Sequence, residues 1–199
     1  MEIKNVVLAG AGVLGSQIAF QAARCGYQVK IWNRHIDRAE RRLAAIKDPF
    51  MREMKASAAD YQAAMDNIVD ISNDLKATVA DADLVIESVS ESVEIKKAFY
   101  GELCPLLPEK TILTSNSSTF IPSELVGFTD RPSRFAHLHF ANHIWKHNVA
   151  EIVGNPKTDP AVIEDLTSFA RSIKMVPVVL KKEQHGYIMN ALLVPLLNA

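Results

Sequence analysis

Two histidines, His137 and His139, stand two positions apart in the run Phe135-Ala136-His137-Leu138-His139-Phe140. If it forms a strand, His137 and His139 project from the same face, because successive side chains of a strand point to opposite faces. An imidazole titrates near neutral pH and can take the proton of a hydroxyl group that is being oxidised. Glu151 lies on the next candidate strand, where a carboxylate could orient such a histidine and stabilise its protonated form. Spacing alone does not choose between the two histidines.

Two imidazoles on one face could also bind a metal ion. Metal sites use further His, Cys, Asp or Glu ligands at characteristic spacings, and no such cluster accompanies His137 and His139 in the sequence. Cys25 and Cys104 form no metal-binding pattern. The sequence therefore predicts no metal site.

Glycine spacing near the start of the chain predicts a nucleotide-binding turn. Gly10-Ala11-Gly12-Val13-Leu14-Gly15 reads G-x-G-x-x-G, between an apolar segment and a segment that favours a helix. In that context Gly10 permits a tight turn, Gly12 lets the backbone approach a pyrophosphate, and Gly15 lets the helix pack closely on the strand. The free N–H groups and the positive end of the helix dipole would hold the phosphates. A dinucleotide is the predicted ligand, and a purely structural turn is the alternative.

The residues at the end of the second candidate strand bear on which dinucleotide binds. The dinucleotide pattern usually places an acidic residue about 20 positions after the glycines, where it accepts from the ribose 2′-hydroxyl. Here Asn33 and Arg34 stand at that point. Asn33 does not repel a 2′-phosphate, and Arg34 or Arg38 could pair with one. The alternative is that these arginines only belong to a solvated helix face. The local chemistry weakens the case for NAD and strengthens the case for NADP.

A polar cluster, Ser115-Asn116-Ser117-Ser118-Thr119, follows another candidate strand. Ligands of open α/β sheets bind at the carboxyl ends of the strands, so this cluster could touch a substrate. The same residue types also cap helices and form turns. Both interpretations remain open at this point.

Strand-like and helix-like segments alternate along the chain, and they must bring these side chains together. Strands are predicted from about residue 3 to 9 and at 28–32, 68–71, 84–86, 111–114, 135–140, 150–153 and 176–180. Helices are predicted at 16–23, 36–47, 50–64, 93–103 and 159–173, with Asp48-Pro49 as a break and Asn73 or Asp74 as a cap. This alternation predicts a Rossmann-type, doubly wound, mostly parallel α/β sheet with right-handed crossovers.

Composition limits the class of partner. The chain has 199 residues, of which 48% are hydrophobic and 23% charged, with a net charge of −1, typical of a soluble globular domain. Without a basic excess, neither nucleic acid nor a membrane surface is the expected partner. No apolar run approaches the roughly 18 residues of a membrane span, and the first strand starts too early for a targeting peptide. A cytoplasmic location is expected.

The last part of the sequence, 186–197, is strongly apolar. A helix of this composition needs a partner surface. We therefore expect residues 1–183 to form the dinucleotide-binding domain. Residues 184–199 would begin a C-terminal helical domain, of which this chain contains only the first helix.

Taken in order, these motifs resemble those of the 3-hydroxyacyl-CoA dehydrogenases over essentially the whole chain. Glu151 follows His139 at the spacing of 12 positions that separates the histidine and catalytic glutamate of that family. The late family motif Gly-Phe-Ile-Val-Asn is Gly186-Tyr187-Ile188-Met189-Asn190 here. The other matching stretches are Gly10–Gly15, Asp83–Glu87, Ser115–Thr119 and His139–His143.

The resemblance implies a role for each site residue. It selects His139 as the base that takes the proton of the substrate 3-hydroxyl while hydride leaves C3 for the nicotinamide, with Glu151 orienting it. Ser118 and Asn190 would hydrogen-bond the reacting oxygens, and Asn142 would help to bind the substrate or the nicotinamide. Glu91 and Lys96 would contact the nicotinamide half of the cofactor. The implied cofactor-binding set is Gly10, Gly12, Val13, Leu14, Gly15, Asn33, Arg34, Glu91, Lys96 and Asn116.

Three departures from the family pattern limit what carries over. The proline after Asn142 is His143, the segment 144–148 on the substrate side differs, and the ribose aspartate is Asn33. Family members also carry a further helical domain that forms the dimer and closes over the substrate, and this chain reaches only its first helix.

The resemblance implies an NAD(P)-dependent oxidoreductase of fatty acid metabolism that acts on a 3-hydroxyacyl-CoA such as 3-hydroxybutyryl-CoA. NAD is the expected cofactor, NADP remains open, and a homodimer is expected for the complete protein. One alternative is a dehydrogenase of a small 3-hydroxy acid without CoA, of the sugar-acid or carnitine type. The other is a dinucleotide-binding module with weak catalysis.

Overall fold

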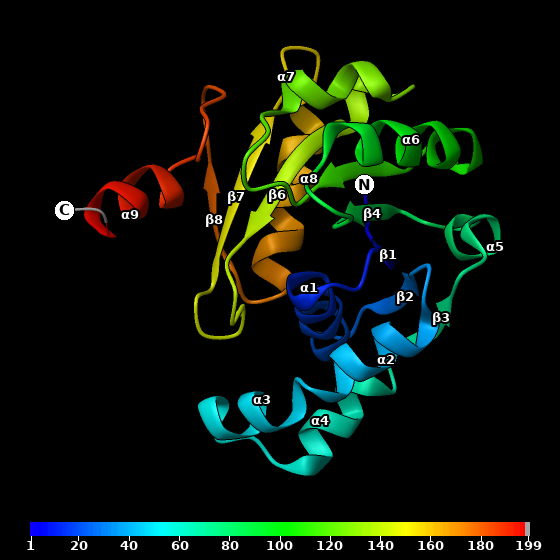
Figure 1. Ribbon diagram of the computed structural model, residues 1–199, viewed down its shortest axis with the longest axis vertical. Helices are drawn as coiled ribbons and strands as arrows, with labels where there is room; N and C mark the ends of the chain where they lie inside the picture. Colours follow the sequence, from blue (N-terminus) through cyan, green and yellow to red (C-terminus); the bar gives the residue numbers. More distant parts are fainter. Residues whose placement is uncertain (198–199) are drawn as a thin grey trace.

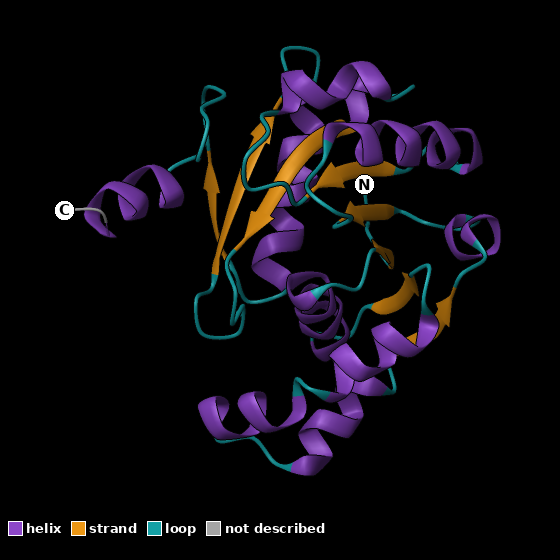
Figure 2. Ribbon diagram, in the orientation of Figure 1, coloured by secondary structure: helices purple, strands orange, loops and turns teal. Residues whose placement is uncertain are grey.

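The computed structural model describes residues 1–197, except for the side chains of 193, 194 and 197, and is built around one eight-stranded sheet (Figures 1 and 2). The strand order is β3-β2-β1-β4-β5-β6-β7-β8. The strands are β1 Asn5–Ala9, β2 Gln28–Trp32, β3 Ile68–Ser72, β4 Leu84–Glu87, β5 Ile112–Ser115, β6 Phe135–Phe140, β7 Val149–Gly154 and β8 Val176–Val179.

The direction of the strands confirms the predicted doubly wound, mostly parallel sheet. Strands β1 to β6 run parallel to one another, β7 pairs antiparallel with β6, and β8 is parallel to β7. Strand β1 pairs with β2 on one side and with β4 on the other, so the strand order reverses there. Such a switch point opens a crevice at the carboxyl ends of the strands, where ligands of this fold bind.

Helices cover both faces of the sheet (Figure 1). Val6 and Leu8 of β1 belong to the apolar core that contains residues of α1, α2 and α8, whereas Val7 and Ala9 belong to the opposite core, under α6 and α7. This alternation is what a strand buried on both faces requires. The helices are α1 Val13–Arg24, α2 Ile36–Ala44, α3 Lys47–Met54, α4 Ala58–Met65, α5 Leu75–Val79, α6 Val93–Leu103, α7 Pro122–Leu125, α8 Pro160–Ser172 and α9 Met189–Leu197.

Every predicted strand lies within two residues of an observed one, but the helical segment between β2 and β3 was predicted wrongly. The expected helices 36–47 and 50–64 are instead α2, α3 and α4. Asp48 and Pro49 do not break a helix, because they lie in the first turn of α3, where a proline costs no hydrogen bond. One break comes earlier, at Ala45 and Ile46 between α2 and α3. A second comes at Lys55, which has a φ of 52°, and Ser57 and Asp60 then start α4 with a capping box.

Two further helices begin at aspartate caps, of which the one before α5 was predicted. The side chain of Asp74 accepts a hydrogen bond from the backbone of Ala77, so Asp74 rather than Asn73 caps α5. Asp159 caps α8. The short helix α7 and the 3₁₀ turns Cys104–Leu106, Val126–Phe128 and Pro132–Arg134 were not anticipated.

Helix α9 lies to one side of the sheet, beyond β8, at the left of Figure 1. Leu192 and Leu196 on this helix are 70% and 73% exposed. The boundary at residue 183 between a dinucleotide-binding domain and a helical domain stays a prediction. None of the helices within residues 1–197 combines the length and the apolar character that crossing a bilayer requires.

Candidate active site

The glycine turn joins β1 to α1 and leaves its backbone accessible. Gly10 has a φ of 106°, and a Cβ atom there would lie 2.5 Å from the carbonyl oxygen of Ser88. A Cβ on Gly15 would collide with the carbonyl oxygen of Gly10, whereas one on Gly12 would meet no described atom within 4 Å. Gly12 is therefore the position at which a side chain would fill open space that a pyrophosphate needs. Gly12 is also the N-cap of α1 and supplies no side-chain cap of its own, so the turn offers backbone N–H groups to an anion.

A cavity of about 280 Å³ opens beside this turn at the switch point of the sheet. Gly10 and Gly12 form its floor together with Trp32, and Val89, Ile95 and Phe99 give it an apolar wall. The remaining lining residues are Ala11, Asn33, Arg34, His35, Arg38, Ser88 and Ser90. Apolar and aromatic side chains next to the backbone of the glycine turn fit an adenine nucleotide. Of the predicted cofactor residues, Gly10, Gly12, Asn33 and Arg34 line the cavity. The others are outside the lining: Val13, Leu14 and Gly15 at the start of α1, and Glu91, Lys96 and Asn116.

Asn33 supports the glycine turn from the end of β2. Its Oδ1 accepts a hydrogen bond of 3.1 Å from the backbone N–H of Ala11, and its Nδ2 donates one of 2.7 Å to the carbonyl of His35. Both polar atoms of the amide are thus used within the protein. Asn33 also lines the cavity, and its predicted contact with the ribose hydroxyl stays a prediction.

A buried carboxylate, Glu87, organises the carboxyl end of β4. Its Oε1 accepts from Lys96 Nζ at 2.7 Å and from the backbone N–H of Val89 at 2.8 Å, and its Oε2 accepts from Tyr100 Oη and Ser115 Oγ, both at 2.7 Å. Lys96 is only 1% exposed. Its ammonium group pairs with the carboxylates of Glu87 and Glu91, and its predicted contact with the nicotinamide half of the cofactor stays a prediction.

Glu91 ties the loop after β4 to the polar cluster after β5. Its Oε1 accepts from Ser117 Oγ at 2.5 Å, from Thr119 Oγ1 at 2.8 Å, and from the backbone N–H groups of Ser118 and Thr119. Its Oε2 lies 3.2 Å from Lys96 Nζ. Burial would raise the pKa of Glu91, but these hydrogen bonds and the ammonium group outweigh it and lower the pKa to about 2. An ionised carboxylate thus holds the segment that carries Ser118.

The predicted histidine, glutamate and serine lie together. His139 and Glu151 are direct cross-strand partners on β6 and β7, so their side chains share a face. His139 Nδ1 lies 2.8 Å from Glu151 Oε2, and His139 Nε2 lies 3.0 Å from Ser118 Oγ. His139 is 4% exposed and Glu151 is fully buried. Sequence separation does not require this contact, and the register of the β6–β7 pair produces it.

The ionisation of Glu151 fixes which nitrogen of His139 carries the proton. Burial would raise the pKa of Glu151, but hydrogen bonds from His139 and from the backbone N–H groups of Met189 and Ile188 together lower it. An ionised carboxylate can only accept, so the facing Nδ1 of His139 must be the N–H. In neutral His139 the lone pair is then on Nε2, on the side of Ser118.

His137 faces a different environment from His139 and cannot meet a substrate. It is fully buried, and its Nδ1 lies 2.7 Å from Tyr187 Oη. The Tyr187 hydroxyl donates to the carbonyls of Ser117 and Phe120, both at 2.8 Å, so His137 donates to it and is neutral. Burial lowers the pKa of His137 to about 3. The Nε2 of His137 has no hydrogen-bond partner among residues 1–197.

The three other predicted asparagines take different places. Asn116 accepts from the backbone N–H of Phe140 through its Oδ1 at 3.0 Å and so joins the ends of β5 and β6. Asn142 is exposed in the loop that follows β6. Asn190 lies in the first turn of α9, next to Met189, whose N–H binds Glu151. Within the described part of the chain, the Asn190 side chain makes no hydrogen bond, and its predicted contact with a substrate oxygen stays a prediction.

The segment that departs from the family pattern is held by α3. The carboxylate oxygens of Glu53 lie 3.0 Å from His143 Nδ1, and one of them accepts from Trp145 Nε1 at 2.8 Å. Gln17 Oε1 accepts from the backbone N–H of His143, which has a φ of 56°. A proline could not donate this backbone hydrogen bond or adopt this φ. His143, Trp145 and Glu53 therefore form one unit that shapes the loop beside Asn142.

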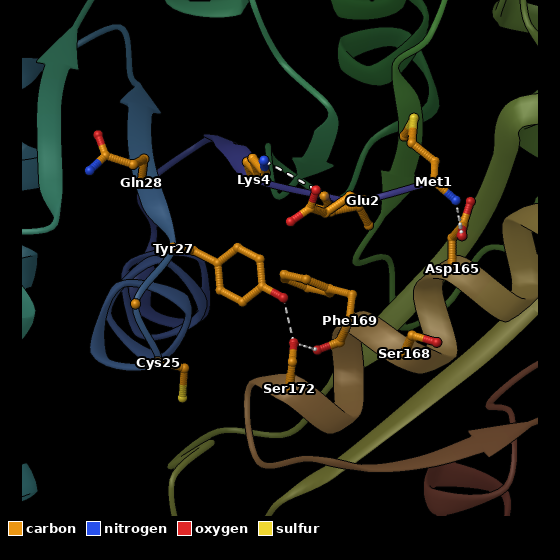
Figure 3. Close-up of a pocket in the computed structure, with 12 residues that line it drawn as sticks. Met1, Glu2, Lys4, Cys25, Tyr27, Gln28, Asp165, Ser168, Phe169 and Ser172 are labelled. Carbon is orange, nitrogen blue, oxygen red and sulfur yellow. Dashed lines mark hydrogen bonds and ion pairs between the residues drawn. The ribbon is translucent and has the colours of Figure 1, made fainter.

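Other cavities and clusters in the described structure lie away from this chemistry. A cavity of about 580 Å³ lies at the amino ends of β1 and β2, where Tyr27 Oη is 2.5 Å from Ser172 Oγ (Figure 3). It is on the opposite edge of the sheet from the glycine turn, and its charged groups pair with one another, the Met1 ammonium with Asp165 and Lys4 with Glu2. No group of three or more His, Cys, Asp or Glu side chains within residues 1–197 is placed to hold a metal ion.

Several residues that shape the site were not singled out from the sequence. Glu87 and Tyr187 join buried polar networks, and Gln17 and Glu53 hold the loop after β6. For Glu87 a signal exists, because an acidic residue that ends an apolar strand must be paired when it is buried. For Glu53 and Gln17 no such signal exists, since their partners are about 90 to 126 residues away.

Comparison with known proteins places this geometry in a family. A solved structure of a diketoreductase, described for its dual catalysis of dicarbonyl compounds, superimposes with a TM-score of 0.95 at 46% sequence identity, covering 100% of this chain and 71% of that one. The 3-hydroxybutyryl-CoA dehydrogenase of Bradyrhizobium diazoefficiens is 31% identical over 98% of this chain and 67% of its own length.

The mitochondrial hydroxyacyl-coenzyme A dehydrogenase of the pig, Sus scrofa, is also 31% identical, over 98% of this chain. The chain spans 64% of the length of that enzyme. The family profile described as "3-hydroxyacyl-CoA dehydrogenase, NAD binding domain" matches residues 5–184. The chain therefore belongs to the 3-hydroxyacyl-CoA dehydrogenase family through its NAD-binding domain, and NAD is its cofactor.

Proposed function

We propose that this chain carries the hydride-transfer site of an NAD-dependent dehydrogenase that interconverts the C3 hydroxyl and ketone of a 3-hydroxyacyl-CoA, such as 3-hydroxybutyryl-CoA. The observation that carries the proposal is the hydrogen-bonded series Ser118–His139–Glu151 at the same sheet edge as the glycine turn. A base whose lone pair faces a hydroxyl group beside a dinucleotide cradle is what oxidation of an alcohol requires.

In the proposed reaction His139 moves the proton. A bound NAD would supply the acceptor for the hydride that leaves C3 of the substrate. His139 Nε2 takes the proton of the 3-hydroxyl, and the imidazolium that forms is stabilised by Glu151 through Nδ1–H. In the reverse direction His139 returns this proton to the oxygen. Ser118 Oγ, 3.0 Å from Nε2, donates to the reacting oxygen and positions it.

The remaining predicted residues hold the reactants in place. We assign Gly10, Gly12 and the start of α1 to the pyrophosphate, and Glu91 to the nicotinamide side, with Lys96 keeping Glu91 ionised. Asn142 and Asn190 would complete the substrate side. Orienting the reactants in this way can supply up to roughly 7–11 kcal/mol of the barrier in favourable cases.

The test is oxidation of 3-hydroxybutyryl-CoA, followed by the appearance of NADH, with the full-length protein and its His139→Ala variant. We expect the variant to lose about a hundredfold or more in kcat, because general base catalysis typically contributes that much. Binding of NADH, measured by fluorescence titration, should stay unchanged, since His139 does not line the nucleotide cavity. Equal rates of turnover in the two proteins would reject His139 as the base.

A second candidate is reduction of a small dicarbonyl compound without CoA. Two observations favour it: the 46% identity to a diketoreductase exceeds the identity to the CoA-dependent relatives above, and the loop held by Glu53, His143 and Trp145 departs from their pattern. NADH oxidation with acetoacetyl-CoA and with a free β-diketo ester separates the two candidates. A higher kcat/KM for the CoA thioester supports the first function, and the opposite order supports the second. Absence of turnover with either compound would leave a module that only binds a dinucleotide.

A further inference from the structure

We propose that the adenosine end of the cavity also takes a phosphate on the ribose 2′-hydroxyl, so that NADP(H) binds at least as tightly as NAD(H). This inference deepens the proposed function and depends on it only for the presence of a dinucleotide in the cavity. It rests on three observations: the neutral residue at the end of β2, the free guanidinium groups beside it, and the absence of acidic side chains from the described lining.

The first observation is that Asn33 removes the group that would exclude a 2′-phosphate. An acidic residue at this point selects NAD because it accepts from the 2′-hydroxyl and repels a phosphate there. Asn33 carries no charge, and its amide hydrogen-bonds Ala11 and His35, so it offers a ribose hydroxyl no carboxylate. Of the described residues that line the cavity, none is Asp or Glu. A ribose 2′-hydroxyl therefore gains no strong acceptor at this position, and a 2′-phosphate meets no repulsion.

The second observation is that two cationic side chains at the same position are free. Arg34 directly follows Asn33, Arg38 lies in the first turn of α2, and both are exposed and line the cavity. Neither forms an ion pair with any residue of the described structure. Asp37, the acidic residue of this turn, is 2.7 Å from Arg41 on the next turn and is not part of the lining. A phosphate is bound well by guanidinium groups, which donate several hydrogen bonds in one plane.

The arrangement differs from that of a merely solvated helix face. Of the arginines on α2, Arg41 has an acidic partner and Arg42 lines a separate, smaller cavity with Gln17. Arg38 is the one on the side of the glycine turn, and Arg34 joins it from the preceding loop. The unpaired cations thus gather where the 2′-position of an adenosine ribose would lie, next to Asn33.

Binding of small nucleotides to the 199-residue chain tests the site directly. Isothermal titration calorimetry would compare 5′-AMP, 2′,5′-ADP and 3′,5′-ADP, the last of which represents the phosphoadenosine end of CoA. We expect 2′,5′-ADP to bind about tenfold or more tightly than the other two, since a charge-assisted contact of roughly 1.5–3 kcal/mol corresponds to that ratio or more. If 5′-AMP or 3′,5′-ADP binds as tightly as 2′,5′-ADP, the proposal is overturned.

Variants then assign the effect to the named residues. Arg34→Ala and Arg38→Ala should each raise the dissociation constant of NADPH about tenfold, because only NADPH carries the phosphate. The dissociation constant of NADH should change by less than about threefold. Arg41→Ala is the matched control, since it removes an arginine of the same helix that points away from the cavity. Asn33→Asp should weaken NADPH relative to NADH. Circular dichroism would show that each variant is folded.

Each outcome of the titrations is decisive. NADPH binding more weakly than NADH to the unmodified chain would overturn the proposal, as would an equal loss of NADPH affinity in Arg41→Ala. Failure of the proposed function would look different: these titrations contain no substrate, so a chain without turnover could still bind 2′,5′-ADP as expected.

Discussion

At the scale of single residues, the site separates two histidines that share one strand face. His139 has one nitrogen fixed by Glu151 and the other beside Ser118, so it is set up to exchange a proton. His137 is fully buried and is bound to the Tyr187 hydroxyl. Burial and hydrogen-bond partners, rather than residue type, therefore decide which imidazole can take part in chemistry.

Tyr187→Phe tests the hydrogen bonds of the buried histidine. The substitution restores the residue type of the family motif but removes a hydroxyl that binds His137 and two backbone carbonyls. We expect the free energy of unfolding to fall by about 1–3 kcal/mol, because buried polar groups lose their partners. Urea denaturation measures this. Tyr27→Phe removes a hydroxyl at an exposed contact and should change the value by no more than about 0.5 kcal/mol. A Tyr187→Phe protein as stable as the unmodified one would contradict the assigned network.

At the scale of elements, the carboxyl ends of neighbouring strands are joined by side chains. Glu87 of β4 accepts from Ser115 of β5, Asn116 accepts from the backbone N–H of Phe140 at the end of β6, and Glu91 holds the loop that carries Ser118. Each connection crosses from one strand end to the next. The loops of the site are therefore positioned by buried polar contacts to rigid strands rather than by their own conformational preference.

The ionised Glu91 should make the stability of this loop depend on pH. Its pKa of about 2 lies below the usual value of roughly 4.3, so its contribution is fully present above that value and is lost as the pH falls toward 2. Glu91→Gln should lower the free energy of unfolding at pH 7 by about 1–2 kcal/mol. The loss is smaller than the shift in pKa alone implies, because about a third of the side chain is exposed and solvent screens its charge.

Urea denaturation between pH 7 and pH 3 checks this expectation. The difference between the two proteins should shrink as the pH falls below about 4. Glu102→Gln on the exposed side of α6 is the control and should show little change at any pH. A difference that is absent at pH 7, or that stays constant down to pH 3, would show that the Glu91 charge does not hold the loop.

Prediction from the sequence succeeded where local patterns determine the structure. The strands, the glycine turn and α6 follow from apolar runs and helix signals that act over a few residues. It failed at α3 and α4, because Pro49 suits the first turn of a helix as well as a break. The contact between Glu53 and His143 could not be predicted, since it depends on how α3 packs against a loop about 90 residues away.

At the scale of the whole molecule, the proposed catalytic pair is connected to the last helix. Glu151 uses one oxygen for His139 and the other for the N–H groups of Ile188 and Met189 at the start of α9. The orientation of His139 is therefore linked to the position of α9, which presents exposed leucines and extends away from the sheet (Figure 1). Formation of a homodimer through a helical domain remains a prediction.

Transfer of the substrate hydrogen is the most direct test of the central claim. The full-length protein would be incubated with NAD and 3-hydroxybutyryl-CoA that carries deuterium on C3, and the NADH formed would be analysed by mass spectrometry. We predict that deuterium appears in the reduced nicotinamide, because the hydrogen leaves C3 as hydride while His139 takes only the hydroxyl proton. NADH free of deuterium, or deuterium released to water, would contradict the account.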